Sequence, residues 1–204
     1  MKAILAVILV LVLAVAGYVL YARHKVQLAI SGPAREIVTE SMTKSGNTWN
    51  VEFVSKFDAP VDRVYEAFSK PERSKELAPE NFLKSELIKE DGNTKLVEIV
   101  AKLDILPPGF KVQTVKTEWT FFPGERRITS HTESKVADID AEYKFEPTPD
   151  GKGTILRFSE KSLDKGAIPI EDVQRGALRE VYITQVKIAN KSLGLGVPQQ
   201  KDAS

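Results

Sequence analysis

The stretch FVSKFDAPVDRVYEAFSKPERSKELAPENF, residues 53–82, is the part of the sequence that says most about the fold. It begins inside the segment TWNVEFVSKF, where apolar and polar residues alternate as they do in a strand with one buried face. Ala59-Pro60 ends that strand, and apolar residues then recur at helical spacing in VDRVYEAF. Pro71 opens a second short helical segment and Pro79 ends it. The pattern predicts a strand, two short helices and a return to strand.

The rest of the chain reads as further strands followed by one helix. Turn signals such as Asp91-Gly92-Asn93 and Pro123-Gly124 separate alternating segments between residues 82 and 163. Residues 170–193 lack proline and carry a broad apolar stripe at helical spacing. Consecutive antiparallel strands twist and curl, so a long helix can cover their concave face. We therefore predict an α+β domain: a curved antiparallel sheet of about seven strands around a long C-terminal helix, with two short helices after the first strand.

The first residues have a different composition. The segment 3–22 has no charged side chain, and a helix of that length spans about 30 Å, the hydrocarbon thickness of a bilayer. Tyr18 and Tyr21 precede Arg23 and Lys25, as interfacial anchors do. We expect a transmembrane anchor over 1–25, a tether over 26–45, the folded domain over 46–195 and a tail over 196–204.

A cleaved signal peptide is the alternative for this segment. Ala14-Val15-Ala16 fits the small-x-small cleavage pattern. The apolar run nevertheless continues to Leu20, past the point where a polar mature segment would begin. We therefore expect a single-pass membrane protein. Lys2 lies on one side of the span and Arg23 and Lys25 on the other, so charge does not select the side on which the domain lies.

Composition limits the partners. Lys and Arg number 29 against 28 for Asp and Glu, and no basic run is present, so we expect no nucleic-acid partner. The chain has no cysteine and only two histidines, His24 and His131. These numbers exclude disulfides and thiolate ligands and disfavour a histidine metal site. We expect no metal and no cofactor, and no residue is singled out as catalytic.

The segment FDAPVDRVYEAFSKPER, residues 57–73, resembles the opening of the helix-grip superfamily, also called START-like or SRPBCC. This superfamily includes the birch-pollen-allergen fold, START lipid-transfer domains, polyketide cyclases and aromatases, and coenzyme-Q-binding proteins. The resemblance covers roughly residues 48–195, together with the single terminal helix. It implies a cavity between the sheet and the C-terminal helix.

Such a cavity needs apolar walls, and the alternating segments supply them. We predict that they bind a lipid, sterol, isoprenoid or quinone; the alternative is that the same residues pack against each other as an ordinary core. The candidate ligand-binding residues are Phe53, Phe57, Val97, Ile99, Leu103, Tyr143, Phe145, Val181, Tyr182 and Ile188.

Few polar residues are candidates for the interior. Glu118 and Glu160 reach the inner face only in one strand register, and a buried carboxyl there would have a raised pKa and could bind a ligand hydroxyl. Arg157 is either a surface arginine or a partner for an anionic ligand group, and we expect His131 to face solvent or the cavity mouth. The loop ILPPGF, residues 105–110, is either a lip of the cavity, a contact with the bilayer or a rigid connection.

Three functions fit these features. The first is a membrane-anchored protein that binds or transfers a hydrophobic small molecule, with that ligand and the bilayer as its partners. The second is an enzyme of the cyclase or aromatase type, which needs polar groups inside the cavity. The third is a scaffold with a filled interior that binds a membrane partner. We predict the first.

Overall fold

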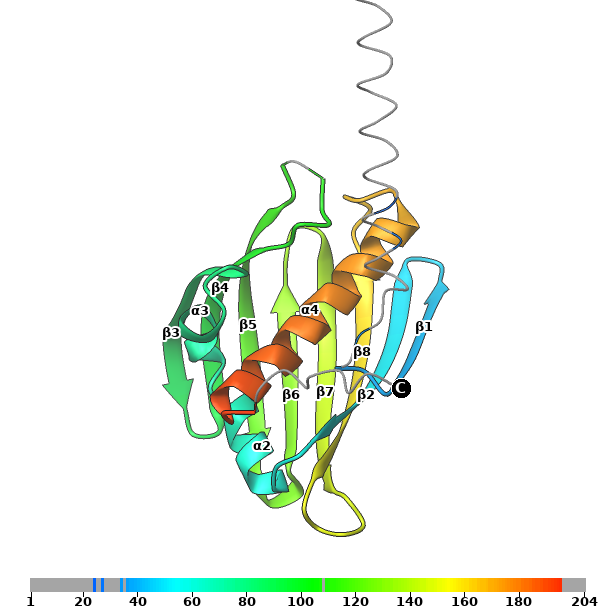
Figure 1. Ribbon diagram of the computed structural model, residues 1–204. Coiled ribbons are helices and arrows are strands. Elements are labelled where there is room, and N and C mark those ends of the chain that lie inside the picture. The colour runs from blue at the N-terminus through cyan, green and yellow to red at the C-terminus, as the bar shows by residue number, and fades with distance from the viewer. Residues whose placement is uncertain (1–23, 25–26, 28–33, 35, 108, 196–204) are drawn as a thin grey trace, which may run out of the picture.

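The computed structural model describes residues 24, 27, 34, 36–107 and 109–195 (Figure 1). The predicted anchor, His24 apart, and the predicted tail lie outside these residues. The elements follow in this order: β1 (Thr39–Ser45), β2 (Thr48–Phe57), α2 (Val61–Phe68), the 3₁₀ turn η1 (Pro71–Arg73), α3 (Ser74–Leu77), β3 (Phe82–Asp91), β4 (Thr94–Lys102), β5 (Val112–Phe122), the 3₁₀ turn η2 (Pro123–Glu125), β6 (Arg127–Glu133), β7 (Ala137–Pro147), β8 (Thr154–Asp164) and α4 (Glu171–Ser192).

All eight strands form one antiparallel sheet in the order β1-β2-β8-β7-β6-β5-β4-β3 (Figure 1). After β2, the chain uses α2, η1 and α3 to cross to the opposite edge, where β3 begins. It then returns strand by strand until β8 pairs with β2. The two short helices are therefore the crossover that the opening stretch of sequence predicted.

The strand count is eight rather than about seven. The additional strand is β1, which lies within the segment that we expected to be a tether. It pairs with β2 along its whole length, from Thr39 opposite Val54 to Ser45 opposite Thr48. Gly46 makes the tight turn between them with a φ of 58°, a conformation that costs glycine little. The sequence did not predict β1, because most side chains of this edge strand are exposed and therefore form no apolar alternation.

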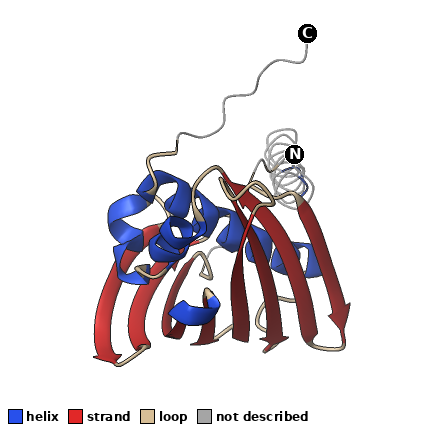
Figure 2. Ribbon diagram, turned by 90° about the horizontal axis from the view of Figure 1, so that it is seen from below, coloured by secondary structure: helices blue, strands red, loops and turns tan. Residues whose placement is uncertain are grey.

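The helix α4 crosses one face of the sheet diagonally (Figure 1), and the helices lie on one side of the curved sheet (Figure 2). Its bounds, Glu171–Ser192, agree with the predicted 170–193. Within the described residues, no helix combines the length and apolar character needed to cross a bilayer.

Strand pairing arranges the inner face into rows that run across the sheet. One row is bulky and apolar: Phe53, Phe158, Tyr143, Ile128 and Phe121. The next row contains Val51, Glu160, Ala141, Ser130 and Trp119. This second row holds a carboxyl group and two small side chains between β2 and β5. Consequently, the space under α4 is filled beside the bulky row, and it is less filled beside the row that contains Glu160.

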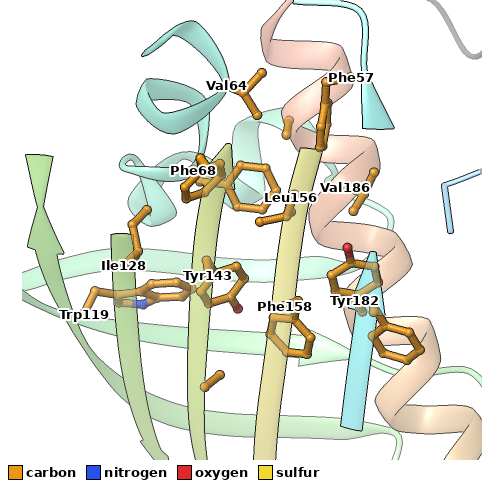
Figure 3. Packing of buried hydrophobic residues seen from close by; sticks show 14 of the residues in the cluster. Phe57, Val64, Phe68, Trp119, Ile128, Tyr143, Leu156, Phe158, Tyr182 and Val186 are labelled. Carbon is orange, nitrogen blue, oxygen red and sulfur yellow. The ribbon is translucent and has the colours of Figure 1, made fainter. Parts of the chain in front are cut away.

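We call the filled part the packed half; it is built around Phe57, Phe68, Tyr143, Leu156 and Phe158. Its rings are in direct contact: the Phe68 and Phe145 centroids lie 5.3 Å apart, and those of Tyr143 and Phe158 lie 4.9 Å apart. Figure 3 shows Tyr143 between Trp119 and Phe158, with α2 residues Val64 and Phe68 closing the cluster. Dense packing of this kind leaves no room for a ligand.

Candidate functional site: a cavity under the first half of the C-terminal helix

A cavity of about 110 Å³ lies between the sheet and the N-terminal half of α4. We call this region the open half. Its wall includes residues from the connection between β4 and β5 and from the first half of α4; this connection and the start of α4 lie at the same end of the domain (Figure 1). The wall is mostly apolar. The wall consists of Trp49, Leu103, Leu106, Gln113, Val136, Ala137, Ile139, Glu160, Ser162, Asp164, Ile168, Gln174, Ala177, Leu178 and Val181.

A small apolar cluster forms the lip of this cavity. Leu106, from the connection between β4 and β5, is buried against Ile168 and Val173. Ile105 and Phe110 pack onto the same cluster. Leu106 of the ILPPGF loop also lines the cavity, which favours the lip among the alternatives that the sequence left open. The loop contacts the start of α4 rather than acting only as a connection between two strands.

Glu160 is the polar group that the cavity leaves unpartnered. Strand β8 places it on the inner face between Val51 and Ala141. Its Oε1 atom is buried and has no hydrogen-bond partner among the described residues, while part of the side chain remains accessible. Burial raises the pKa of this carboxyl group from 4.5 to about 8, because the apolar surroundings disfavour the charged form. At neutral pH, Glu160 is therefore mainly a neutral carboxylic acid.

Three other polar groups of the wall, Trp49, Asp164 and Gln174, belong to one hydrogen-bond network. The Gln174 Oε1 atom accepts hydrogen bonds from Trp49 Nε1 and from Lys44 Nζ, each at 2.9 Å. Gln174 Nε2 donates to Asp164 Oδ2 at 2.7 Å, and Lys44 Nζ lies 3.5 Å from the same carboxylate oxygen. This network ties β1, β2, β8 and α4 together at the cavity end. Glu160 lies outside this network.

Two tyrosines of the main core cluster make hydrogen bonds between α4 and the sheet. The Tyr143 hydroxyl donates to Gln185 Oε1 at 2.9 Å, and the Tyr182 hydroxyl lies 2.6 Å from Ser55 Oγ. Burial raises the pKa of both phenols, and both stay protonated at physiological pH. They act as neutral hydrogen-bonding groups that fix α4 against the sheet.

The structure divides the ten predicted ligand-binding residues. Leu103 and Val181 line the cavity. The other eight are buried outside its wall, and all but one of them belong to the main core cluster: Phe53, Phe57, Val97, Ile99, Tyr143, Phe145, Tyr182 and, outside that cluster, Ile188. A contact between a ligand and any of the ten stays a prediction.

The remaining polar candidates lie on the outer face of the sheet. Glu118 is exposed there, and Arg157 Nε pairs with Glu146 at 3.0 Å. His131 faces solvent, as predicted, and a hydrogen bond to Asp140 at 2.7 Å raises its pKa. In the described part of the chain, no three His, Cys, Asp or Glu side chains are grouped so that they could hold a metal ion.

Sequence reasoning missed the polar frame of the cavity, Trp49, Asp164 and Gln174. A signal was present in β8, where the inner positions change along the strand from Leu156 and Phe158 to Glu160, Ser162 and Asp164. This change marks the border between the packed and the open half. It becomes readable only when the inner face of β8 is known.

The chain belongs to the family described as polyketide cyclase / dehydrase and lipid transport, whose model matches residues 48–181. This membership confirms the resemblance to the START-like superfamily. A search of curated proteins finds no match.

Solved structures share the fold at low sequence identity. An aromatase/cyclase, Zhui from Streptomyces sp. R1128, is 16% identical with a TM-score of 0.56 over 72% of this chain and 92% of that one. A START superfamily protein from Mycobacterium smegmatis is 11% identical, with a TM-score of 0.58 over 72% and 99%. Truncated norcoclaurine synthase from Thalictrum flavum is 15% identical, with a TM-score of 0.55 over 79% and 99%. These likenesses establish a helix-grip fold.

Proposed function

We propose that this protein is anchored in a membrane by residues 1–25 and binds a small hydrophobic ligand in the cavity between the sheet and α4. The observation that carries the proposal is the apolar cavity itself. The family description, which names both polyketide cyclases and lipid transport, supports a hydrophobic ligand.

The energy of the cavity supports a role in binding. The cavity is partly open to solvent, so its mainly apolar wall is in contact with water when no ligand is bound. A ligand that fills the space removes this apolar surface from water, at about 25 cal/mol per Å² of surface buried. A cavity of this size takes a small apolar group, and a larger ligand extends beyond it.

The anchor supports a ligand drawn from the bilayer. The uncharged segment 3–22 is long enough to span the hydrocarbon layer. A tether of this kind raises the local concentration of the domain near lipid-soluble molecules. Binding or transfer of such a molecule is then favoured without high affinity for free ligand in water.

A second function is favoured by one observation. Glu160 is a buried acid with a pKa near neutrality, which is the property of a general acid in catalysis. In the cyclase alternative, Glu160 protonates a substrate oxygen inside the cavity. If it does so, Glu160→Gln abolishes turnover and leaves binding in place.

Native mass spectrometry of the full chain, released from mild detergent, tests ligand binding. Lipids that coat the anchor are expected in every sample, so the control is Ala177→Leu, which places an isobutyl group in the cavity. We expect a discrete adduct in the parent protein and its loss in the Ala177→Leu variant. The same adducts in both proteins would overturn the proposal.

Membrane attachment is tested separately by washing membranes with alkaline carbonate. We expect the chain to stay in the membrane pellet. A variant with Leu9→Arg and Leu13→Arg disrupts the apolar run and should be released, since each charge at the centre of a span costs about 2.5–3.5 kcal/mol on insertion scales. Release of the parent chain would overturn the anchor.

A further inference from the structure

The unpartnered carboxyl group of Glu160 restricts the chemistry of the ligand. Its Oε1 atom is buried at the cavity wall without a hydrogen bond from any described residue. The cavity wall around it is mainly apolar, and the nearby polar groups of Gln174 and Asp164 already bond each other. A buried polar group left in this state is unfavourable, so a ligand atom that pairs with it contributes to both affinity and orientation.

The surroundings of Glu160 distinguish between ligand classes. The described wall offers no cation to an anionic ligand, because its charged residues are the two acids Glu160 and Asp164. A cationic ligand would require a buried carboxylate, and a mainly apolar wall disfavours both members of such an ion pair. A neutral carboxylic acid instead carries one O–H donor. Its natural partner is an oxygen that accepts a hydrogen bond.

We propose that Glu160 donates a hydrogen bond to a carbonyl oxygen of an otherwise apolar, neutral ligand, and that it selects ketone-type molecules over acids, amines and plain hydrocarbons. This inference rests on the proposed function, since it names the ligand class of the same cavity.

Charged groups on the surrounding elements do not alter this assignment. Lys44 on β1 pairs with Asp164 on β8, and Arg179 on α4 donates to Glu40 on β1 at 2.8 Å. Arg175 and Glu180, also on α4, are not part of the cavity wall. The inner faces of β2 and β7 place Val51 and Ala141 beside Glu160. The titratable group on β7 that interacts with Glu160 is the Tyr143 phenol; burial and the Glu160 charge raise its pKa, so it stays neutral.

The proposal implies a pH dependence of fixed sign. Only the protonated form of Glu160 donates, and burial holds the pKa of this group at about 8. Affinity for a carbonyl ligand is therefore constant below that pKa and falls about tenfold for each pH unit above it. A hydrocarbon ligand of the same shape shows no such fall.

A matched set of small probes tests the proposal in the full chain, embedded in lipid nanodiscs. Acetophenone, ethylbenzene and 1-phenylethylamine share a phenyl ring and a two-carbon side chain. The carbon next to the ring is a carbonyl in the first and a methylene in the second, and it carries an amine in the third. The readout is the indole N–H signal of Trp49, one of two tryptophans, whose indole bonds Gln174 in the cavity wall. We expect acetophenone to bind about tenfold more tightly than ethylbenzene, the typical effect of one hydrogen bond. The amine should bind most weakly.

Three variants isolate the hydrogen bond. Glu160→Leu removes the donor and should bring acetophenone to the affinity of ethylbenzene. Glu160→Gln keeps an N–H donor that does not titrate, so binding of acetophenone should persist and lose its pH dependence. Glu118→Gln makes the same change on the outer face and should leave every probe unaffected.

The outcomes separate the two proposals. Binding of no probe, with unchanged Trp49 signals, would overturn the proposed binding function itself. Equal binding of acetophenone and ethylbenzene, or tighter binding of 1-phenylethylamine, would overturn the carbonyl assignment and leave the cavity as a binding site. Loss of affinity above about pH 8 for ethylbenzene as well would show that the cavity itself changes, and would also overturn the assignment.

Discussion

The packed half and the open half of this domain are built by the same strands and the same helix, but they are filled differently. In the packed half, the rings of Phe53, Tyr143 and Tyr182 surround Phe158, with centroids 4.9–6.0 Å away. In the open half, the next positions of β7 and β8 are Ala141 and Glu160, and a cavity of about 110 Å³ remains under α4. The change from the packed half to the cavity therefore occurs between two adjacent rows of residues.

This difference explains how the domain stays folded although its interior contains a cavity. The packed half holds α4 and α2 to the sheet through a continuous aromatic cluster. The network around Gln174 then fixes the far end of α4 at the open half. The helix is held at both ends, so the space between these contacts does not collapse. The packed core and the proposed binding site therefore occupy different parts of one interior.

The largest expected effect is the loss of a ring from the packed half. Phe158→Ala should lower the free energy of unfolding by about 3–5 kcal/mol, because the surrounding rings cannot close the space that it leaves. Leu103→Ala, in the wall of the open half, should cost less than half as much because Leu103 already borders empty space. Urea unfolding followed by tryptophan fluorescence measures both. Equal losses would show that the two halves are equally packed.

The second effect is on the pH dependence of stability. The Glu160 pKa is raised from 4.5 to about 8 in the folded state. Between these values the folded protein keeps a proton that the unfolded chain releases. The free energy of unfolding should therefore fall as pH rises, by up to about 1.4 kcal/mol per pH unit. Glu160→Gln should flatten this slope in unfolding curves taken across the window, and Glu118→Gln should not. An unchanged slope in Glu160→Gln would show that the carboxyl group is solvated.

The third effect compares the same substitution at two places on α4. Ala189 is buried in the packed half, so Ala189→Leu should destabilise the fold by about 1–3 kcal/mol through overpacking. Ala177 borders the cavity, so Ala177→Leu should be neutral or stabilising. Thermal unfolding of the two variants in parallel checks the difference. If Ala177→Leu were as damaging as Ala189→Leu, the open half would be closed in solution.

The smallest effect lies on the outer face, away from both halves. Asp140 raises the pKa of His131 in the folded state, so this pair stabilises the protein below the ordinary His pKa of 6.5, and the contribution is lost as pH rises through the raised value. Because both side chains are exposed, Asp140→Asn should cost less than about 1 kcal/mol at mildly acidic pH. Urea unfolding at acidic and alkaline pH tests this sign. A larger loss at alkaline pH would contradict it.

Much of the fold could be predicted because it depends on local patterns. Three patterns can each be read within a single segment: the alternation in TWNVEFVSKF, the proline-bounded short helices and the proline-free apolar stripe of α4. Strand β1 escaped prediction because an exposed edge strand has no buried face to generate a pattern. The same alternation predicted which residues face the interior, but of the ten predicted ligand-binding residues only Leu103 and Val181 line the cavity.

The amino-acid pattern alone indicates that alternate residues of β2, β7 and β8 face an interior, and that a long helix covers them. Which of those interior positions contact other rings, and which border the cavity, depends on how the strands and the helix pack together. Strand register sets Glu160 beside Val51 and Ala141. The diagonal path of α4 brings Val181 to the cavity and Tyr182 to Phe53. Neighbouring residues of one helix thus differ in role, because packing depends on what lies opposite in space rather than on what lies next in sequence.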